Sequence, residues 1–249
     1  TGNLVWVRND IGFGGNRMPV SISHIYNTGE ASSNIRGLGF GWRTNFHQSV
    51  GVWMNVEGTE WYYAWTDADG TMHYFYQVLV TPENQEDIQV EGLEGRDLFQ
   101  DEDGLGLTLG VAPYSAEYTT DKYIIIDKQG NKSFFDSLGR LIKMENNQQI
   151  ASSITIAYDD GNADAIERSL RISKVVDGAG REYRFSYSAD NLLTRIGYYG
   201  TGTTEVSHIS FAYSNNQLTA VTDQDGKTST YGYENGLLTS AADIDGYAI

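Results

Sequence analysis

Cysteine is absent from this 249-residue chain, and proline occurs only three times. Without cysteine there can be no disulfide, no thiolate catalysis and no cysteine-bound zinc or iron–sulfur centre. Because prolines are few, most of the backbone is free to donate the hydrogen bonds of a sheet. No apolar run approaches the ~20 residues that a membrane-spanning helix needs, so we expect no membrane insertion.

Positive charge is scarce as well. The chain has 17 lysines and arginines against 33 aspartates and glutamates, which gives a formal net charge of −16. Binding to nucleic acid needs a cationic surface for the phosphates, and docking to an anionic membrane needs the same. The composition therefore argues against both kinds of partner.

What the chain does contain is a short phrase repeated in one register: an aspartate, two residues, a glycine, four residues and an aromatic. The complete copies are Asp67/Gly70/Phe75, Asp127/Gly130/Phe135, Asp177/Gly180/Phe185 and Asp223/Gly226/Tyr231. Partial copies are Asp101/Gly104, with leucine in the aromatic position, and Asp243/Gly246. Such self-similarity is typical of repeat proteins, whose units stack into surfaces and walls rather than single catalytic centres.

Around these phrases, apolar and aromatic residues alternate with polar ones. Ile154, Ile156 and Tyr158 show this period of two, and the pattern recurs at 183–187 and 209–213. The alternation predicts half-buried strands, and an aspartate followed by glycine predicts the tight turn of a hairpin. Asparagine-rich phrases near 191, 215 and 235 predict a second reversal after each return strand. We therefore predict an all-β fold of consecutive β-hairpin repeats that form a large curved or spiral antiparallel sheet.

The same pattern suggests two regions of one continuous sheet. Residues 1–150 form an N-terminal β region, and residues 151–249 hold the most regular hairpins. An acidic, glycine-rich stretch at about 80–118 lacks the alternation. We predict loops and one or two short strands there, inserted into the first region.

Several phrases carry a family resemblance. Residues 135–141 read Phe-Asp-Ser-Leu-Gly-Arg-Leu, which resembles the YD repeat, Tyr-Asp-x-x-Gly-Arg-Leu, with phenylalanine in place of tyrosine. Upstream, 19–27 followed by Gly-Leu-Gly-Phe-Gly-Trp-Arg at 37–43 is similar to the stretch that opens the repeat region of RHS proteins. Wall-associated proteins of Gram-positive bacteria carry this stretch too. The resemblance implies structural turn roles for Asp67, Gly70, Asp127, Gly130, Asp136, Gly139, Asp177, Gly180, Asp223 and Gly226.

The family implies a large secreted or cell-surface bacterial polypeptide whose repeats wind a sheet into a hollow β-shell. In many members the shell encloses a C-terminal toxin, and in relatives such as the teneurins the repeats serve in cell adhesion. We accordingly expect this chain to be a structural fragment of such a shell, the front part of its wall. Its partners would be the downstream repeats and the C-terminal passenger of its own polypeptide.

A second hypothesis comes from the aromatic residues of one predicted strand. Trp61, Tyr63 and Trp65 fall on the same face of that strand. An exposed ladder of this kind would stack on sugar rings and make the chain a surface adhesin or carbohydrate-binding module for cell-surface glycans. The core of a large β-sheet needs the same residues, so both explanations stay open at this point.

Four turns have the form Asp-x-Asp-Gly, at 67–70, 101–104, 223–226 and 243–246. Calcium takes six to eight oxygen ligands, which is more than one such turn supplies. A hydrogen-bonded turn explains the aspartates without a metal. Asp223 and Asp225 form the best candidate pair for weak calcium binding, and we expect no other cofactor.

No motif indicates an enzyme. The glycines at 37, 39 and 41 lack the spacing and the following helix of a nucleotide loop, so tight packing explains them better. His24, His47, His73 and His208 are scattered, and no Gly-x-Ser-x-Gly elbow is present. A glycosidase or lyase would need two buried carboxylates in a cleft, which a sequence cannot bring together. We therefore expect no catalytic activity.

Overall fold

A computed structural model describes residues 3–78, 90–113, 121–148, 150, 152–159, 170–245 and 247. Within these residues the chain forms 19 strands and a short 3₁₀ helix, η1 (Thr28–Glu30). The strand pairings are antiparallel and join strands that follow one another in the chain. The predicted all-β fold of consecutive hairpins is thus confirmed.

The chain divides into two compact units. Unit 1 comprises Thr1–His47, Ala68–Gly70 and Ile154–Ile249, and unit 2 comprises Gln48–Asp67 and Thr71–Ser153. The first strands of the chain therefore pack with its last hairpins. The predicted boundary after residue 150 concerned the type of repeat, and it stays a prediction.

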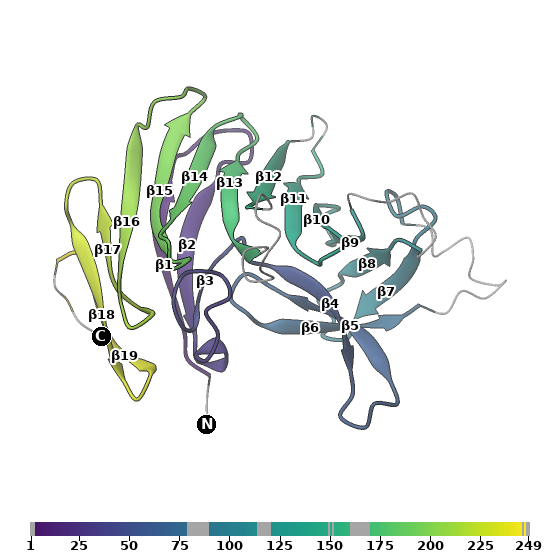
Figure 1. Ribbon diagram of the computed structural model, residues 1–249. Helices are drawn as coiled ribbons and strands as arrows, with labels where there is room; N and C mark the ends of the chain where they lie inside the picture. Colours follow the sequence, from purple (N-terminus) through teal and green to yellow (C-terminus); the bar gives the residue numbers. More distant parts are fainter. Residues whose placement is uncertain are drawn as a thin grey trace. The chain divides into compact units, whose positions relative to one another are not determined.

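Unit 1 contains two antiparallel sheets (Figure 1). The small sheet has the order β1 (Val5–Gly12), β2 (Ser21–Asn27), β3 (Trp42–Thr44). The large sheet follows chain order through β12 (Ser153–Tyr158), β13 (Ile172–Val176), β14 (Glu182–Tyr187), β15 (Leu193–Gly200), β16 (Ser207–Ser214), β17 (Gln217–Asp223), β18 (Thr228–Glu234) and β19 (Leu237–Ala242).

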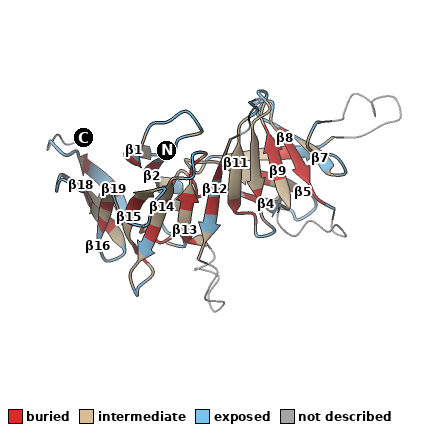
Figure 2. Cartoon of the chain, turned by 90° about the horizontal axis from the view of Figure 1, so that it is seen from above, coloured by how far each residue is buried: buried red, intermediate tan, exposed pale blue. Residues whose placement is uncertain are grey.

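The two sheets of unit 1 pack face to face through aromatic side chains. Trp42 of the small sheet is 1% exposed, and its ring centroid lies 4.9 Å from that of Tyr231 in β18. Farther along, the Phe13 ring stacks on Tyr198 of β15 at 4.0 Å. Along β14 the alternation places Tyr183 on the buried face, as the period of two predicts. Figure 2 shows the buried positions as red segments along the strands.

In unit 2 the strands again pair in chain order. They are β4 (Ser49–Met54), β5 (Trp61–Thr66), β6 (Met72–Gln77), β7 (Asp97–Asp101), β8 (Thr108–Val111), β9 (Tyr123–Ile126), β10 (Lys132–Phe135) and β11 (Leu141–Glu145). β7 and β8 are two short strands in the acidic stretch and pair with each other and with the neighbouring β6 and β9. The parts of that stretch at 79–89 and 114–120 lie outside the described residues.

The first strand of unit 2, β4, contacts the turn that precedes its last strand, β11. The Val50 amide donates to the Gly139 carbonyl at 2.9 Å, and Ser49 forms an isolated bridge with Arg140. Gly139 has φ +79°, and a Cβ there would lie 2.0 Å from the Val50 carbonyl oxygen. Only glycine fits this approach, because it has no Cβ and tolerates positive φ. The side chains buried on the core face of the sheet are Val50, Phe75, Leu109, Ile125, Phe135 and Leu141.

The repeated aspartate–glycine phrase builds one recurring turn. At Asp177 the amide donates to the Arg181 carbonyl at 3.0 Å, and Oδ1 accepts from the amides of Ala179 and Arg181 at 2.9 Å each. Gly180 supplies the positive φ of +79°. The same bonds between an aspartate and the residue four positions later occur at Asp67, Asp127, Asp136, Asp223 and Asp243.

One copy of the phrase differs. The Asp101 amide donates to the Leu107 carbonyl at 3.2 Å, six positions away instead of four. Its carboxylate accepts from the amides of Leu105 and Leu107. The longer turn needs a second glycine, and Gly104 and Gly106 have φ of +73° and +74°. Spacing alone therefore did not identify this turn.

Candidate functional site

The three aromatic residues predicted to form one face on β5 have separate surroundings. Trp61 is 74% exposed. Tyr63 is half-buried, with its ring centroid 4.8 Å from that of Phe99. Trp65 is also half-buried and lies 5.1 Å from the His73 ring, and its indole nitrogen is buried without a hydrogen-bond partner among the described residues. The structure thus brings Trp61 and Tyr63 to a common surface and leaves Trp65 in the packing.

Trp61 and Tyr63 line a cavity of about 1420 Å³ in unit 2, called here the fork cavity. It lies where β5 and β6 separate. The pairing of these strands ends at Tyr63 and Phe75. Beyond that point, residues 61–62 pair with β4 only and residues 76–77 pair with β7 only. β5 and β6 therefore diverge there (Figure 1).

Most of the residues that line the fork cavity are aromatic, and all of its charged lining residues are carboxylates. The aromatic residues are Trp61, Tyr62, Tyr63, Tyr74, Phe75, Tyr76 and Phe99. Glu60, Asp97 and Glu102 supply the carboxylates, and no described lining residue is basic. Burial raises the pKa of the Tyr63 phenol, and the negative charge of Asp97 raises it further.

The sequence prediction missed the contribution of β6 and β7 to this cavity. Tyr74, Phe75 and Tyr76 are three consecutive aromatic residues, a signal that was available in the sequence. Phe99 gave no such signal, because it comes from the acidic stretch. Strand pairing places it near Tyr63.

Of the two aspartates proposed for calcium, Asp223 has its carboxylate engaged in the turn. Asp223 Oδ1 accepts from the amides of Asp225 and Lys227 at 2.9 Å each. No group of three or more His, Cys, Asp or Glu residues in the described part of the chain is placed to hold a metal ion. Weak calcium binding at Asp223 and Asp225 stays a prediction.

A buried polar group lies between the two sheets of unit 1. The His24 side chain is fully buried, and its Nδ1 lies 2.6 and 2.7 Å from the two carboxylate oxygens of Asp10. Nδ1 therefore donates to Asp10, and Nε2 lies 2.5 Å from the Tyr231 hydroxyl. Burial raises the pKa of the Tyr231 phenol, so the hydroxyl is neutral and can donate to Nε2. Sequence reasoning missed this group because Tyr231 is 207 positions from His24, and Asp10 lies at an irregularity in the β1–β2 pairing.

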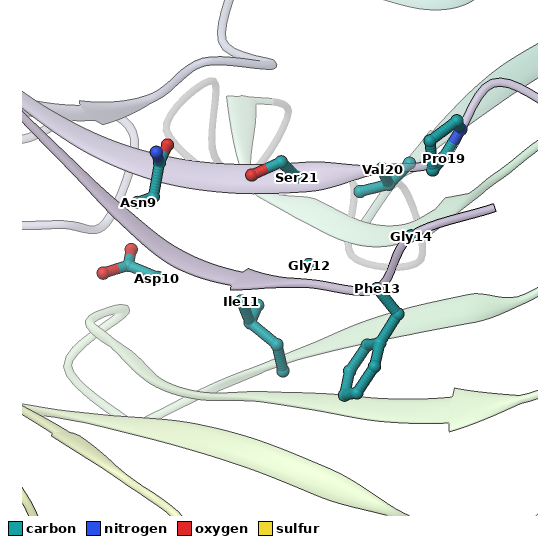
Figure 3. A pocket seen from close by; sticks show the side chains of 9 residues that line it. All are labelled: Asn9, Asp10, Ile11, Gly12, Phe13, Gly14, Pro19, Val20 and Ser21. Carbon is teal, nitrogen blue, oxygen red and sulfur yellow. The ribbon is translucent and has the colours of Figure 1, made fainter.

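A smaller cavity of about 350 Å³ lies at the end of the β1–β2 hairpin (Figure 3). Ile11 and Phe13 point from it toward the strands of the large sheet. Asp10 also lines it, but the carboxylate is 1% exposed and is held by His24. The cavity thus has no free charged group with which to select a ligand, and we assign it none.

The glycines at 37, 39 and 41 form a loop that contacts the repeat turns of unit 1. Gly37 accepts a bond from the Leu193 amide at 2.6 Å, and a Cβ on it would lie 2.6 Å from the Asn191 carbonyl oxygen. A Cβ on Gly39 would lie 2.8 Å from the Asn216 carbonyl oxygen. These glycines therefore hold the backbone against two successive hairpin turns, which is the tight packing expected of them.

Two comparisons by sequence bear on these features. The family model described as RHS Repeat matches residues 213–248, where the turns at Asp223 and Asp243 lie. The chain thus carries an RHS repeat in its last hairpins. A second model, described as a domain of unknown function (DUF6531), matches residues 1–75, which include the small sheet and the glycine loop. No curated protein sequence matches.

Among solved structures, the chain is similar to the N-terminal domain of the effector protein SpvB from Salmonella typhimurium strain LT2. The TM-score is 0.59 at 12% identity, covering 91% of this chain and 99% of that one. At this identity the likeness shows a shared fold. A porin-like protein from Bacteroides uniformis also aligns, at a TM-score of 0.29 and 11% identity over 98% of this chain and 93% of that one, too weakly to carry an argument.

No helix in the described part of the chain is long and apolar enough to span a membrane.

Proposed function

We propose that this RHS-repeat chain is a structural segment of a β-shell that encloses a passenger polypeptide. The observation that carries the proposal is the small sheet of unit 1, which covers the aromatic face of the large sheet through contacts such as Trp42 with Tyr231. A repeat sheet buries aromatic residues on one face, and that face needs a cover. Repeats beyond those that β1–β3 cover need another one, and an enclosed polypeptide would provide it.

The last strand supports growth of the wall. β19 pairs with β18 along one side, and the turn at Asp243 has the bonds of the earlier turns. In each of those turns the chain returns beside the strand that it has just left. The β19 edge is therefore suited to receive another RHS hairpin, and an open sheet edge favours such pairing.

Export and the lack of catalysis belong to the same proposal. The SpvB domain, which shares the fold, is the N-terminal part of an effector protein. We propose a comparable arrangement here, in which the RHS segment is secreted or surface-exposed and precedes the active part of the polypeptide. In this arrangement the segment itself performs no chemistry.

Electron cryo-microscopy of the whole encoded polypeptide that contains this chain tests the proposal. We expect a closed β-shell with density inside, in which 1–249 form part of the wall. In parallel, trypsin should spare the passenger in native protein and cleave it once urea opens the shell. An open or rod-like particle, or a passenger cleaved at once without denaturant, would contradict containment.

A further inference from the structure

The proposed enclosure of a passenger makes no use of the fork cavity of unit 2, and the chemistry of the cavity points to a ligand. Two of its lining rings, Trp61 on β5 and Tyr76 on β6, are 74% and 54% exposed, and the period of two places them on opposite faces of the sheet. Large exposed aromatic side chains are unfavourable in water, and a cluster of them beside a cavity marks a binding surface. Tyr63 and Phe99 continue the aromatic wall inward, where their rings meet edge to face at 4.8 Å.

The charge of the cavity selects among ligands. Glu60, Asp97 and Glu102 are exposed and form no ion pair with any described residue, and the described lining has no basic side chain. The chain as a whole carries a net charge of −16. These carboxylates would repel an anionic ligand. A cation would be attracted by the carboxylates and also by the negative faces of the aromatic rings.

The geometry of the fork distinguishes a sugar from a peptide. A peptide strand would have to pair with the free backbone edges at 61–62 on β5 and 76–77 on β6. Two residues on each side are short for that, since strands usually pair over about 5–6 residues. Flat rings are plentiful instead, and the C–H face of a pyranose ring packs on an aromatic ring while its polar groups reach outward.

We propose that the fork cavity binds a glycan whose sugar rings carry free amino groups. In this arrangement Trp61 and Tyr63, which share one face of the sheet, stack on the sugar rings, and an ammonium group pairs with Asp97 on the same face. Trp61 and Tyr63 of the aromatic ladder thus serve the site, and Trp65 does not. The inference does not depend on the shell, because the cavity lies within unit 2.

Calorimetric titration at physiological salt tests the proposal with three oligosaccharides: a glucosamine hexamer, its fully N-acetylated counterpart and a neutral glucose hexamer. We expect the glucosamine hexamer to bind at least about tenfold more tightly than the other two, a difference of about 1.4 kcal/mol. Trp61→Ala and Asp97→Asn should each weaken that binding by about tenfold or more. Both residues are exposed, so neither substitution should unfold the sheet.

Trp53→Ala is the matched control. Trp53 lies on the neighbouring β4, is 48% exposed and does not line the fork cavity, so its loss should leave the affinity unchanged. If Trp61→Ala and Trp53→Ala bind the glucosamine hexamer like the native protein, the attraction is only general charge and the proposal is wrong. Equal affinity for all three oligosaccharides would overturn the role of the amine. A lysine hexamer that binds more tightly than the glucosamine hexamer, and loses affinity in Trp61→Ala, would show a peptide site instead.

Discussion

The Nε2 atom of His24 and the hydroxyl of Tyr231 lie 2.5 Å apart, although 207 positions separate the two residues in the sequence. His24 belongs to the second strand of the chain and Tyr231 to the second-last. The bond is a polar contact inside an apolar sandwich, between rings that include Trp6 and Trp42. It therefore ties the small sheet of unit 1 to the far end of the repeat sheet.

Replacing Tyr231 by phenylalanine tests that tie. The Tyr231→Phe variant keeps the ring but leaves Nε2 of the buried His24 without its partner, which should lower the free energy of unfolding by about 1–3 kcal/mol. Urea denaturation followed by tryptophan fluorescence measures the change. Tyr76→Phe is the control, because Tyr76 is 54% exposed and its loss should change stability by less than about 0.5 kcal/mol. Equal stability of the two variants would show that the bond contributes nothing.

The glycine loop gives a second prediction. Gly37→Ala adds a Cβ where φ is +77° and the Asn191 carbonyl oxygen would be 2.6 Å away, so it should cost backbone strain and a clash together. Gly226→Ala at φ +80° has open space around the new Cβ and should cost the strain alone, of order 1–3 kcal/mol. Thermal unfolding should therefore place Gly37→Ala clearly below Gly226→Ala. If the two melt together, the loop yields without cost and does not fix the hairpin.

His47 makes stability depend on pH on the acid side. Burial lowers its pKa well below 6.5, and the positive charges of Arg36 and Arg43 lower it further. The unfolded chain therefore takes up a proton below about pH 6.5 that the folded chain does not, so the contribution of His47 is lost as the pH falls. Urea titrations from pH 7 to about pH 5 should show stability decreasing in the native protein and decreasing less in His47→Gln. Identical slopes would mean that His47 is protonated in the fold.

His73 acts in the opposite direction. Burial lowers its pKa, but hydrogen bonds to the carboxylates of Asp103 and Asp67 outweigh burial, and the net shift is upward from 6.5. Its contribution is complete below about pH 6.5 and is lost as the pH rises through the higher pKa of the folded state. The difference in unfolding free energy between native protein and His73→Gln should therefore shrink above that pH. NMR titration of the His73 ring gives an independent check, and a midpoint below 6.5 would contradict the assignment.

Local interactions explain how much of the fold was predictable. The turn at Asp177 uses atoms within five consecutive residues, so its aspartate and glycine could be recognised without any tertiary information. The asparagine reversals were equally local, and Asn191, Asn216 and Asn235 do adopt positive φ. The turn at Asp101 deviated because a second glycine, Gly106, extends it.

The long-range features could not be predicted in the same way. Nothing near His24 in the sequence indicates Tyr231 as its partner, because only the packing of the two sheets brings them together, and Asp10 reaches His24 through a bulge in the β1–β2 pairing. The sequence predicted only part of the fork cavity for a related reason. A period of two placed Trp61 and Trp65 on one face, but the separation of β5 and β6 leaves the first exposed while Trp65 packs against His73.

The self-contained turns also bear on how such genes can change in length. Because each turn closes its hydrogen bonds within itself, a hairpin can be duplicated or deleted by recombination without rewriting its neighbours. The hairpin turns at Asn191 and Asn216 are exceptions, since Gly39 fits against the second and Gly37 against the first, and so is the upstream turn at Gly139, whose carbonyl accepts from the Val50 amide. Copy number should therefore vary among related genes downstream of these two hairpins, while the part that meets the glycine loop keeps a constant length.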